Sequence, residues 1–355
     1  MNNKAIVYLE NIRYNIRNIK KQIGKTDIIG VIKGDAYSHG ILEVANICIE
    51  EGINKLCVGS IEEAIFLREN GIKEQKILLL LPPTEDNIDC LIKYNITPTV
   101  YSLKHLELIK KKENKIDIEI EIDTGIGRSG CKKEEFYDII RFIKDNNINL
   151  KAIYTHLYNK NNYEVSLKQL NEFKQYKCDI QDVKYHIGGA YALCYGQDFL
   201  LDEIRLGIGL YGLADMSLGG CNLKPVLELN SRICDIIQVK KGQRIGYNNN
   251  EVIFERESKL AMLNLGYSYG YPNLKRGIVK VNGKYCEIVG GINMMNFCVD
   301  ITNVEDVKVG DWVNIYSINN TDKNSILELS KINNLKPGIF VYGLNSQYIK
   351  RVYKN

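Results

Sequence analysis

Eight short apolar runs, separated by amphipathic segments, fill residues 27–208 and restrict the folds open to this chain. The runs read DIIGVIK, LCVGS, ILLLL, TPTV, IDIEIEID, LKAIYTH, VKYHI and EIRLGI, and segments such as 62–70 and 134–145 between them have helical periodicity. Strands that alternate with helices form parallel sheets, and a count of eight favours a closed barrel over an open sheet. We therefore predict an α/β fold with a (β/α)8 TIM-type barrel. A helix over residues 10–22, with Asn11 as its N-cap, is expected before the first barrel strand.

The pattern changes after Gly212. A loop leads into LKPVLELNSRICDIIQV, and the later runs KLAMLNLGY, GIVKVNG, YCEIVGGI, FCVDIT and WVNIYS resemble strands, with one helix expected near residues 325–332. This predicts a mainly β domain that starts near Asn222. We place the barrel at residues 1–220 and the β domain at 221–355, and leave open whether the first strand of the chain joins the β domain.

Composition and charge exclude several classes of protein. The 355 residues are 45% hydrophobic and 25% charged, which is typical of a soluble globular protein. A net charge of +4 is too small to indicate nucleic-acid binding, because lysines and carboxylates are interleaved. No apolar run is long enough to span a membrane, and the first residues contain no signal-peptide core. We expect a cytoplasmic protein with no membrane partner.

Cysteine and histidine give no sign of a disulfide framework or a metal site. The ten cysteines form no C-x-x-C pair, and several lie inside apolar runs, where Cys behaves as a small hydrophobic residue. The four histidines, at positions 39, 105, 156 and 186, are too scattered to indicate metal ligands. We predict no metal.

The run KIDIEIEID has one apolar and one acidic face. Isoleucines at 116, 118, 120 and 122 alternate with carboxylates at 117, 119, 121 and 123. In a barrel, the isoleucines would pack outward against helices and the carboxylates would point inward, where buried charge needs cationic partners. The alternative is an edge strand with a solvated acidic face. The count of eight strands favours the barrel.

Lys33 ends the apolar run IIGVI and is a candidate Schiff-base lysine, because a strand end at the rim of a barrel is where ligands bind. The alternative is a solvated surface lysine. The stretch resembles the lysine motif of alanine racemases, V-V-K-A-N-A-Y-G-H-G, in which the lysine carries pyridoxal 5'-phosphate (PLP). This chain departs from the motif at Gly34, Asp35 and Ser38 and keeps Lys33, Ala36, Tyr37, His39 and Gly40.

The segment IDTGIGRSG places Arg128 among three glycines after a strand, and Arg is well suited to holding a carboxylate through two hydrogen bonds. If this motif stood alone, a loop Arg in a surface salt bridge would be the favoured interpretation. It resembles the alanine racemase K-x-D-T-G-M-G-R-x-G, whose Arg helps to bind the substrate carboxylate. The family's leading lysine, which can carry a carbamate, is Glu121 here. We predict that Glu121 replaces the carbamate electrostatically.

RLGIGLYG contains two glycines that let backbone amides approach a phosphate. It resembles the family's R-P-G-I-x-L-Y-G, which implies that Arg205 faces the pyridine nitrogen of PLP and that the amides of Gly207 and Ile208 hold its phosphate. The same resemblance adds the hydroxyl of Tyr37 to that phosphate and places His156, from YTHL, against the Arg. One departure removes a serine hydroxyl from this cradle, since the family's Asn-Ser is Gly189-Ala190 here.

The β domain is expected to supply the second base. GQRIGYNNN resembles G-E-x-V-S-Y-G, which assigns Tyr247 as the base on the face opposite Lys33. In this family that tyrosine reaches the partner's site, so a homodimer is predicted. Further resemblances place Tyr267 and Met294, through its backbone amide, at the substrate and Tyr342 at the phosphate and inner gate. Charged residues of the family's entrance are replaced by Tyr269, Asn273, Gly291 and Met295.

The resemblance to alanine racemases runs from Val7 to Tyr353. It implies a PLP-dependent enzyme that interconverts L- and D-alanine, a peptidoglycan precursor, by a two-base mechanism with Lys33 and Tyr247. The alternatives are a racemase of serine or another amino acid, or a PLP-binding protein without turnover. A related barrel decarboxylase is disfavoured by Arg205 at the pyridine nitrogen, where that family has a carboxylate, and by the absence of its cysteine motif.

Overall fold

The computed structural model describes residues 2–112, 116–159, 161–214, 220–246 and 251–355. Within them, eight parallel strands pair in the order β8-β7-β6-β5-β4-β3-β2-β9. All eight predicted runs form these strands, which are β2 (Asp27–Val31), β3 (Lys55–Val58), β4 (Lys76–Leu79), β5 (Thr97–Val100), β6 (Asp117–Glu121), β7 (Asn149–Tyr154), β8 (Lys184–His186) and β9 (Glu203–Leu206). The backbone bonds from Asp202 N to Tyr185 O and from Arg205 N to Gly188 O connect the two ends, so the predicted barrel is confirmed.

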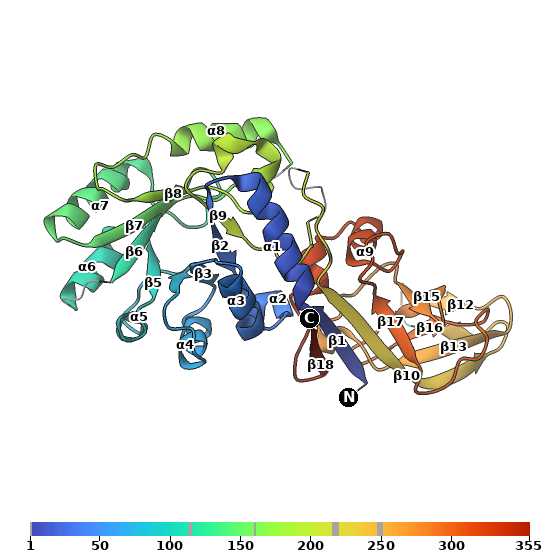
Figure 1. Cartoon of the computed structure of the whole chain (residues 1–355). Coiled ribbons are helices and arrows are strands. Elements are labelled where there is room, and N and C mark those ends of the chain that lie inside the picture. The colour runs from blue at the N-terminus through green and yellow to red at the C-terminus, as the bar shows by residue number, and fades with distance from the viewer. Residues whose placement is uncertain (1, 113–115, 160, 215–219, 247–250) are drawn as a thin grey trace.

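Helices surround the barrel strands (Figure 1). They are α1 (Leu9–Ile23), α2 (Lys33–Ser38), α3 (Ile41–Glu50), α4 (Ile61–Glu69), α5 (Ile88–Lys93), α6 (Leu103–Lys111), α7 (Lys133–Asp145) and α8 (Tyr163–Phe173), with the 3₁₀ turns η1 (Ala190–Tyr195) and η2 (Gln197–Phe199) before β9. The predicted cap of α1 was wrong. Tyr8 is the N-cap, and the Asn11 side chain instead donates to Pro225 O at 2.7 Å, which ties α1 to the segment before the β domain.

The C-terminal half and the N-terminal strand β1 form a mainly antiparallel sheet in the order β13-β16-β15-β14-β17-β10-β1-β18, with β13 also paired to β10. Its elements are β1 (Asn3–Tyr8), β10 (Leu227–Val239), β13 (Ser258–Leu263), η4 (Tyr267–Tyr269), β14 (Ile278–Val281), β15 (Lys284–Ile292), β16 (Phe297–Asp300), β17 (Trp312–Tyr316), α9 (Ile326–Asn333), η5 (Pro337–Phe340) and β18 (Ile349–Lys354), beside a two-stranded pair, β11 (Arg244–Ile245) and β12 (Val252–Ile253). The strand β1 pairs with β10 and β18. The boundary at residue 220 stays a prediction.

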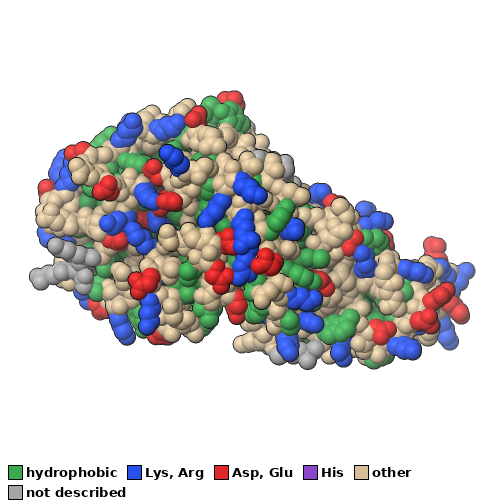
Figure 2. All heavy atoms as spheres, in the orientation of Figure 1, with side chains coloured by type: hydrophobic (Ala, Val, Ile, Leu, Met, Phe, Trp, Pro, Cys, Tyr) green, Lys and Arg blue, Asp and Glu red, His purple; other side chains and the backbone are tan. Residues whose placement is uncertain are grey.

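The surface carries both signs of charge. In Figure 2, Lys and Arg side chains are interspersed with Asp and Glu over the visible face of both halves. None of the described helices is both long enough and apolar enough to cross a membrane.

Candidate active site

Lys33 lies just past β2, at the carboxyl ends of the barrel strands, where the sites of TIM barrels are built. Residues 28–32 are buried, whereas Lys33 is exposed. Gly59, after β3, makes room for the lysine stem, since a Cβ there would lie 3.2 Å from Lys33 Cβ. The apolar strand therefore ends on an amine that projects from the rim.

The segment α2, which begins at Lys33, is a left-handed turn. Residues 35–38 all have positive φ, between 52° and 65°, and none is glycine. Such a backbone costs roughly 1–2 kcal/mol per residue, so other contacts must hold it. The Asp35 amide donates to Glu63 Oε1 at 3.0 Å, its carboxylate accepts from Ile41 N at 2.9 Å, and it forms an ion pair with Arg351 of β18. Both domains thus fix the turn that carries Lys33.

One cavity of about 250 Å³ gathers most of the predicted site residues. Those that line it are Lys33, Tyr37, Glu121, Arg128, His156, Arg205, Gly207 and Ile208. An adjoining cavity of about 550 Å³ is lined by Lys33, Tyr37 and Tyr342, whose two tyrosine rings lie 5.0 Å apart. With His156 neutral, the three cations and one carboxylate of the smaller cavity give it a net charge of +2, which suits an anionic ligand.

Arg205 is buried at the base of this cavity and held on several sides. Its Nη2 donates to Thr155 O at 2.7 Å and to His156 Nδ1 at 3.2 Å, and its Nη1 donates to His186 Nδ1. The ring of Tyr154 lies 4.8 Å from the guanidinium carbon. Burial, then the charge of Arg205, lowers the pKa of His156 to about 3, so His156 is a neutral acceptor near pH 7.

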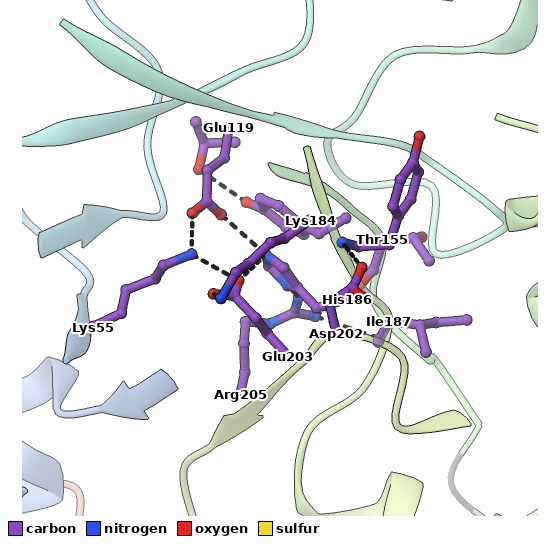
Figure 3. Close-up of polar contacts among 12 residues, drawn as sticks. Lys55, Glu119, Thr155, Lys184, His186, Ile187, Asp202, Glu203 and Arg205 are labelled. Carbon is purple, nitrogen blue, oxygen red and sulfur yellow. Dashed lines mark hydrogen bonds and ion pairs between the residues drawn. The ribbon is translucent and has the colours of Figure 1, made fainter. Parts of the chain in front are cut away.

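The acidic face of β6 points into the barrel, as predicted. Glu119 and Glu121 are buried, and β6 lies between β5 and β7, so it is not an edge strand. The cationic partner of Glu119 is Lys55, whose Nζ lies 2.8 Å from Glu119 Oε1 and 2.7 Å from Glu203 Oε2 (Figure 3). Glu119, Glu203 and His186 are close enough together to bind a cation, and the Lys55 ammonium supplies that positive charge.

The segment after β9 has the form of an anion cradle. Among the described residues, the amides of Gly207 and Ile208 donate no hydrogen bond to the protein, and unpaired amides at a cavity favour an anion. A Cβ on Gly207 would lie 2.7 Å from the Tyr37 hydroxyl, so glycine lets that hydroxyl lie close to the backbone of the cradle. Burial raises the pKa of Tyr37, which keeps its hydroxyl a donor. These donors, Arg205 and the Lys33 amine together fit PLP.

Arg128 is at the open side of the cavity. Its side chain is 66% exposed, and its Nη2 lies 3.7 Å from Glu121 Oε1, an ion pair longer than a hydrogen bond. The loop is braced by Asp123, whose carboxylate accepts from the amides of Gly125 and Gly127 at 3.0 and 3.1 Å. Glu121 thus provides a negative charge beside Arg128 without the close contact of a bidentate pair.

Two predicted residues lie away from both cavities. Tyr267 and Met294 are exposed neighbours in the β domain, where Tyr267 N donates to Asn293 O and Met294 O accepts from Ser268 N. Met295 beside them is also exposed. Tyr247 lies outside the described residues. The substrate roles of Tyr267 and Met294 and the catalytic role of Tyr247 therefore stay predictions.

The replaced entrance residues differ in exposure. Tyr269 is buried against Tyr348, with its hydroxyl 3.2 Å from Asn264 Oδ1, so it packs inside the β domain instead of lining an entrance. Asn273 and Met295 are exposed and Gly291 is half-buried.

Sequence reasoning missed Tyr154, Lys55 and His186 as parts of the site. Tyr154 stacks on His186 with ring centroids 4.8 Å apart, and its hydroxyl bonds Thr99 Oγ1 at 2.9 Å. It is the last residue of β7 and lies two residues before His156, so continued alternation could have placed both side chains inside the barrel. The signal for Lys55 was a charged residue at the start of an apolar run.

Comparison with known proteins agrees with this architecture. The family described as alanine racemase, N-terminal domain, matches residues 7–215, and the alanine racemase C-terminal domain matches 226–353. Alanine racemase 1 of Clostridium acetobutylicum is 32% identical over 346 residues, covering 92% of this chain and 89% of that protein.

Solved structures give the same result. The crystal structure of alanine racemase from Bartonella henselae with covalently bound pyridoxal phosphate has a TM-score of 0.88 at 26% identity and covers all of both chains. Alanine racemase of Clostridium difficile has a TM-score of 0.89 at 30% identity, covering 100% of this chain and 96% of that one. The chain belongs to the alanine racemase family.

Proposed function

We propose that this chain is a PLP-dependent racemase that interconverts L- and D-alanine. The observation that carries the proposal is the cavity that brings Lys33, Arg205 and Arg128 together with the unpaired amides of Gly207 and Ile208. An amine, a guanidinium at the cavity base and a separate phosphate cradle are the groups that PLP and an amino acid require. The names of the relatives support the same activity.

The chain's residues divide the binding of PLP between them. Lys33 would attach the cofactor, Tyr37 and the amides of Gly207 and Ile208 would hold its phosphate, and Arg205 would donate to its ring nitrogen. His156 supports Arg205, and Tyr342 closes the outer side next to Tyr37. When bound, PLP supplies an electron-withdrawing ring that acidifies the Cα–H bond of the amino acid.

Arg205 limits which reaction follows. A guanidinium stays protonated near neutral pH, so it can donate a hydrogen bond but does not readily release a proton. Arg205 would therefore give the ring nitrogen a hydrogen bond without protonating it, which would favour prompt return of the proton to Cα over decarboxylation. Lys33 would exchange this proton on one face, and Tyr247, reaching in from the partner subunit, would exchange it on the other.

Substrate size and charge are set by the groups around Lys33. Arg128 would bind the substrate carboxylate, with Glu121 as its counter-charge. Tyr37 and Tyr342, whose ring centroids are 5.0 Å apart on the wall of the outer cavity, would lie beside the substrate side chain and favour a small one such as that of alanine.

A homodimer completes the site in this proposal. Tyr267, Met294 and Met295 form an exposed, largely apolar group in the β domain, and exposed apolar patches mark interaction surfaces. In the proposed homodimer, these three side chains would face the cavity of the partner subunit and be covered by it. Tyr247 would lie at the partner's Lys33. We also place the enzyme in the cytoplasm.

A D/L exchange screen in deuterated solvent tests the proposal. The purified chain with PLP is expected to interconvert L- and D-alanine and to place deuterium at Cα in both. Serine and larger amino acids in the same screen report the substrate range. Carbon dioxide release would indicate a decarboxylase, and PLP binding without exchange of any amino acid would indicate a binding protein; either result refutes the proposal. Lys33→Ala should abolish both covalent PLP attachment and exchange.

A further inference from the structure

Next to Arg205, ionisable side chains from four barrel strands meet in a buried cluster (Figure 3). Lys55 comes from β3, Glu119 from β6, His186 from β8 and Glu203 from β9, and all four are at most 8% exposed. Buried charges destabilise a protein unless they are paired and hydrogen-bonded, so an unassigned cluster of this kind needs an explanation. The mechanism above uses none of the four.

The contacts form a chain that ends on Arg205. Lys55 Nζ donates to Glu119 Oε1 at 2.8 Å, while the other carboxylate oxygen, Oε2, lies 3.0 Å from His186 Nε2. The second ring nitrogen, His186 Nδ1, contacts Arg205 Nη1. Glu119 and His186 each use a different atom for each of their two contacts. The side chains of Lys55, Glu119, His186 and Arg205 are therefore connected in series.

The donor directions along this chain fix the proton on His186. A guanidinium nitrogen can only donate, so His186 Nδ1 must accept and cannot carry a proton. The proton therefore lies on Nε2, from which it is donated to Glu119 Oε2. If both ring nitrogens carried a proton, the Nδ1–H group would face an N–H group of the Arg205 guanidinium, and the two donors would repel each other. Burial, partly offset by Glu119, lowers the pKa of His186, in agreement with a neutral ring.

Lys55 keeps the cluster in this state. Burial alone would raise the pKa of Glu119, but the His186 hydrogen bond and the Lys55 charge outweigh it and lower that pKa to about 2. Lys55 also bonds Glu203, whose Oε2 lies 3.9 Å from His186 Nε2, too far for a hydrogen bond. Glu203 is also paired with Lys184, whose Nζ lies 3.4 Å from its Oε1, so Lys55 balances the charge of Glu119 without a proton on Nδ1.

We propose that Lys55, Glu119 and His186 are positioning residues that hold the Arg205 guanidinium in the orientation it needs at the base of the cavity. The inference rests on the proposed function, because the orientation of Arg205 matters to catalysis only if Arg205 acts on a bound PLP ring. Glu119 orients His186 through its Nε2–H, His186 orients Arg205 through Nδ1, and Lys55 fixes which oxygen of Glu119 faces the ring.

Glu119→Gln would reverse the direction of this chain. Lys55 needs an acceptor, so the amide oxygen would face Lys55 and the amide NH₂ would face His186 Nε2. His186 would then carry its proton on Nδ1, toward Arg205, and the guanidinium would have to move. Glu203→Gln is the matched control, because it removes the same charge from the same lysine at a buried site but leaves the Glu119–His186 bond in place.

Histidine ring ¹⁵N NMR of the full-length chain without PLP reads the tautomer directly, with the His186 signals assigned from a His186→Asn variant. The wild-type chain should show His186 neutral and protonated on Nε2, Glu203→Gln should match it, and Glu119→Gln should shift the proton to Nδ1. With PLP bound, Glu119→Gln should lower kcat about tenfold, at the lower end of what loss of a supporting hydrogen-bond partner typically costs, and Glu203→Gln should leave kcat near that of wild type.

A wild-type His186 protonated on Nδ1 or on both nitrogens overturns the proposal, and this result does not depend on either glutamine variant. Equal kcat for the two glutamine variants overturns it as well. A wild-type chain with the expected tautomer but no exchange of any amino acid would instead refute the proposed function, while the positioning contacts would stand.

Discussion

Replacing Gly207 with alanine tests how tightly the phosphate cradle is packed. An alanine Cβ would lie 2.7 Å from the Tyr37 hydroxyl oxygen, but 3.5 Å from the ring carbon that bears it and 3.7 Å from Val31 Cβ. Ordinary contact begins near 3.4 Å, so the overlap of 0.7 Å (3.4 minus 2.7) is confined to one oxygen atom. The φ angle of Gly207 is outside the left-handed range, so its backbone accepts alanine.

Overpacking of this kind typically costs about 1–3 kcal/mol, so Gly207→Ala should lower the free energy of unfolding of the PLP-free chain by that amount. Adding Tyr37→Phe should recover most of the loss, because it removes the clashing oxygen. Urea unfolding of the wild type, both single variants and the double variant gives the coupling free energy. Gly189→Ala is the matched control in the same cavity, since its Cβ would meet only Arg205 O, at 3.4 Å.

An equal loss of stability in the presence and absence of the Tyr37 hydroxyl would refute this reasoning. A loss in Gly189→Ala as large as that in Gly207→Ala would do so too, because it would show that any added methyl group in this cavity destabilises the chain.

Three further predictions concern charge and hydrogen bonding at the site. Glu121→Gln should raise the KM for alanine up to about fivefold, because an exposed ion pair such as that with Arg128 is worth about 1 kcal/mol or less; steady-state kinetics with an unchanged KM would show that the charge does not support Arg128. Ala190→Ser should tighten PLP binding about fivefold in a fluorescence titration, since it restores one hydroxyl worth about 1 kcal/mol. Burial lowers the pKa of His39 to about 4 and, with Arg205, that of His156 to about 3, both below the ordinary 6.5. The stability that these neutral rings provide is complete above pH 6.5 and is lost as pH falls toward 3, so the urea midpoint should already decrease between pH 7 and 5; a constant midpoint would contradict it.

The barrel was predictable because its signal is local. Each strand is an apolar run bounded by polar residues. The alternation in 116–123 correctly predicted that Glu119 and Glu121 point into the barrel interior. The helix α1 was placed to within one residue at each end. Its cap was not, because the Asn11 side chain is used by a partner 214 residues away, Pro225, which no local pattern reveals.

The parts that sequence could not supply depend on distant contacts. Four successive non-glycine residues in a left-handed turn are unfavourable locally, and the Asp35 contacts that hold them come from Glu63 and Arg351, 28 and 316 residues away. The alternation of 116–123 indicated that Glu119 needs a cation but could not identify it as Lys55. The motifs also placed Tyr267 and Met294 at the substrate, while within one chain they lie outside the cavity, and Tyr247 lies outside the described residues.

The charge balance of the cavity explains why a carboxylate at position 121 is useful. Lys33, Arg128 and Arg205 provide three positive charges, and a phosphate ester brings about −1.5 to −2 near pH 7. With Glu121 the protein contributes +2, so the loaded cavity comes close to neutral before an amino acid enters. With a neutral residue at 121, Arg128 would lack its counter-charge and the cavity would keep about one uncompensated positive charge. A carboxylate fixed on β6 meets this requirement at every carbon dioxide concentration, so the activity of this chain should be independent of bicarbonate.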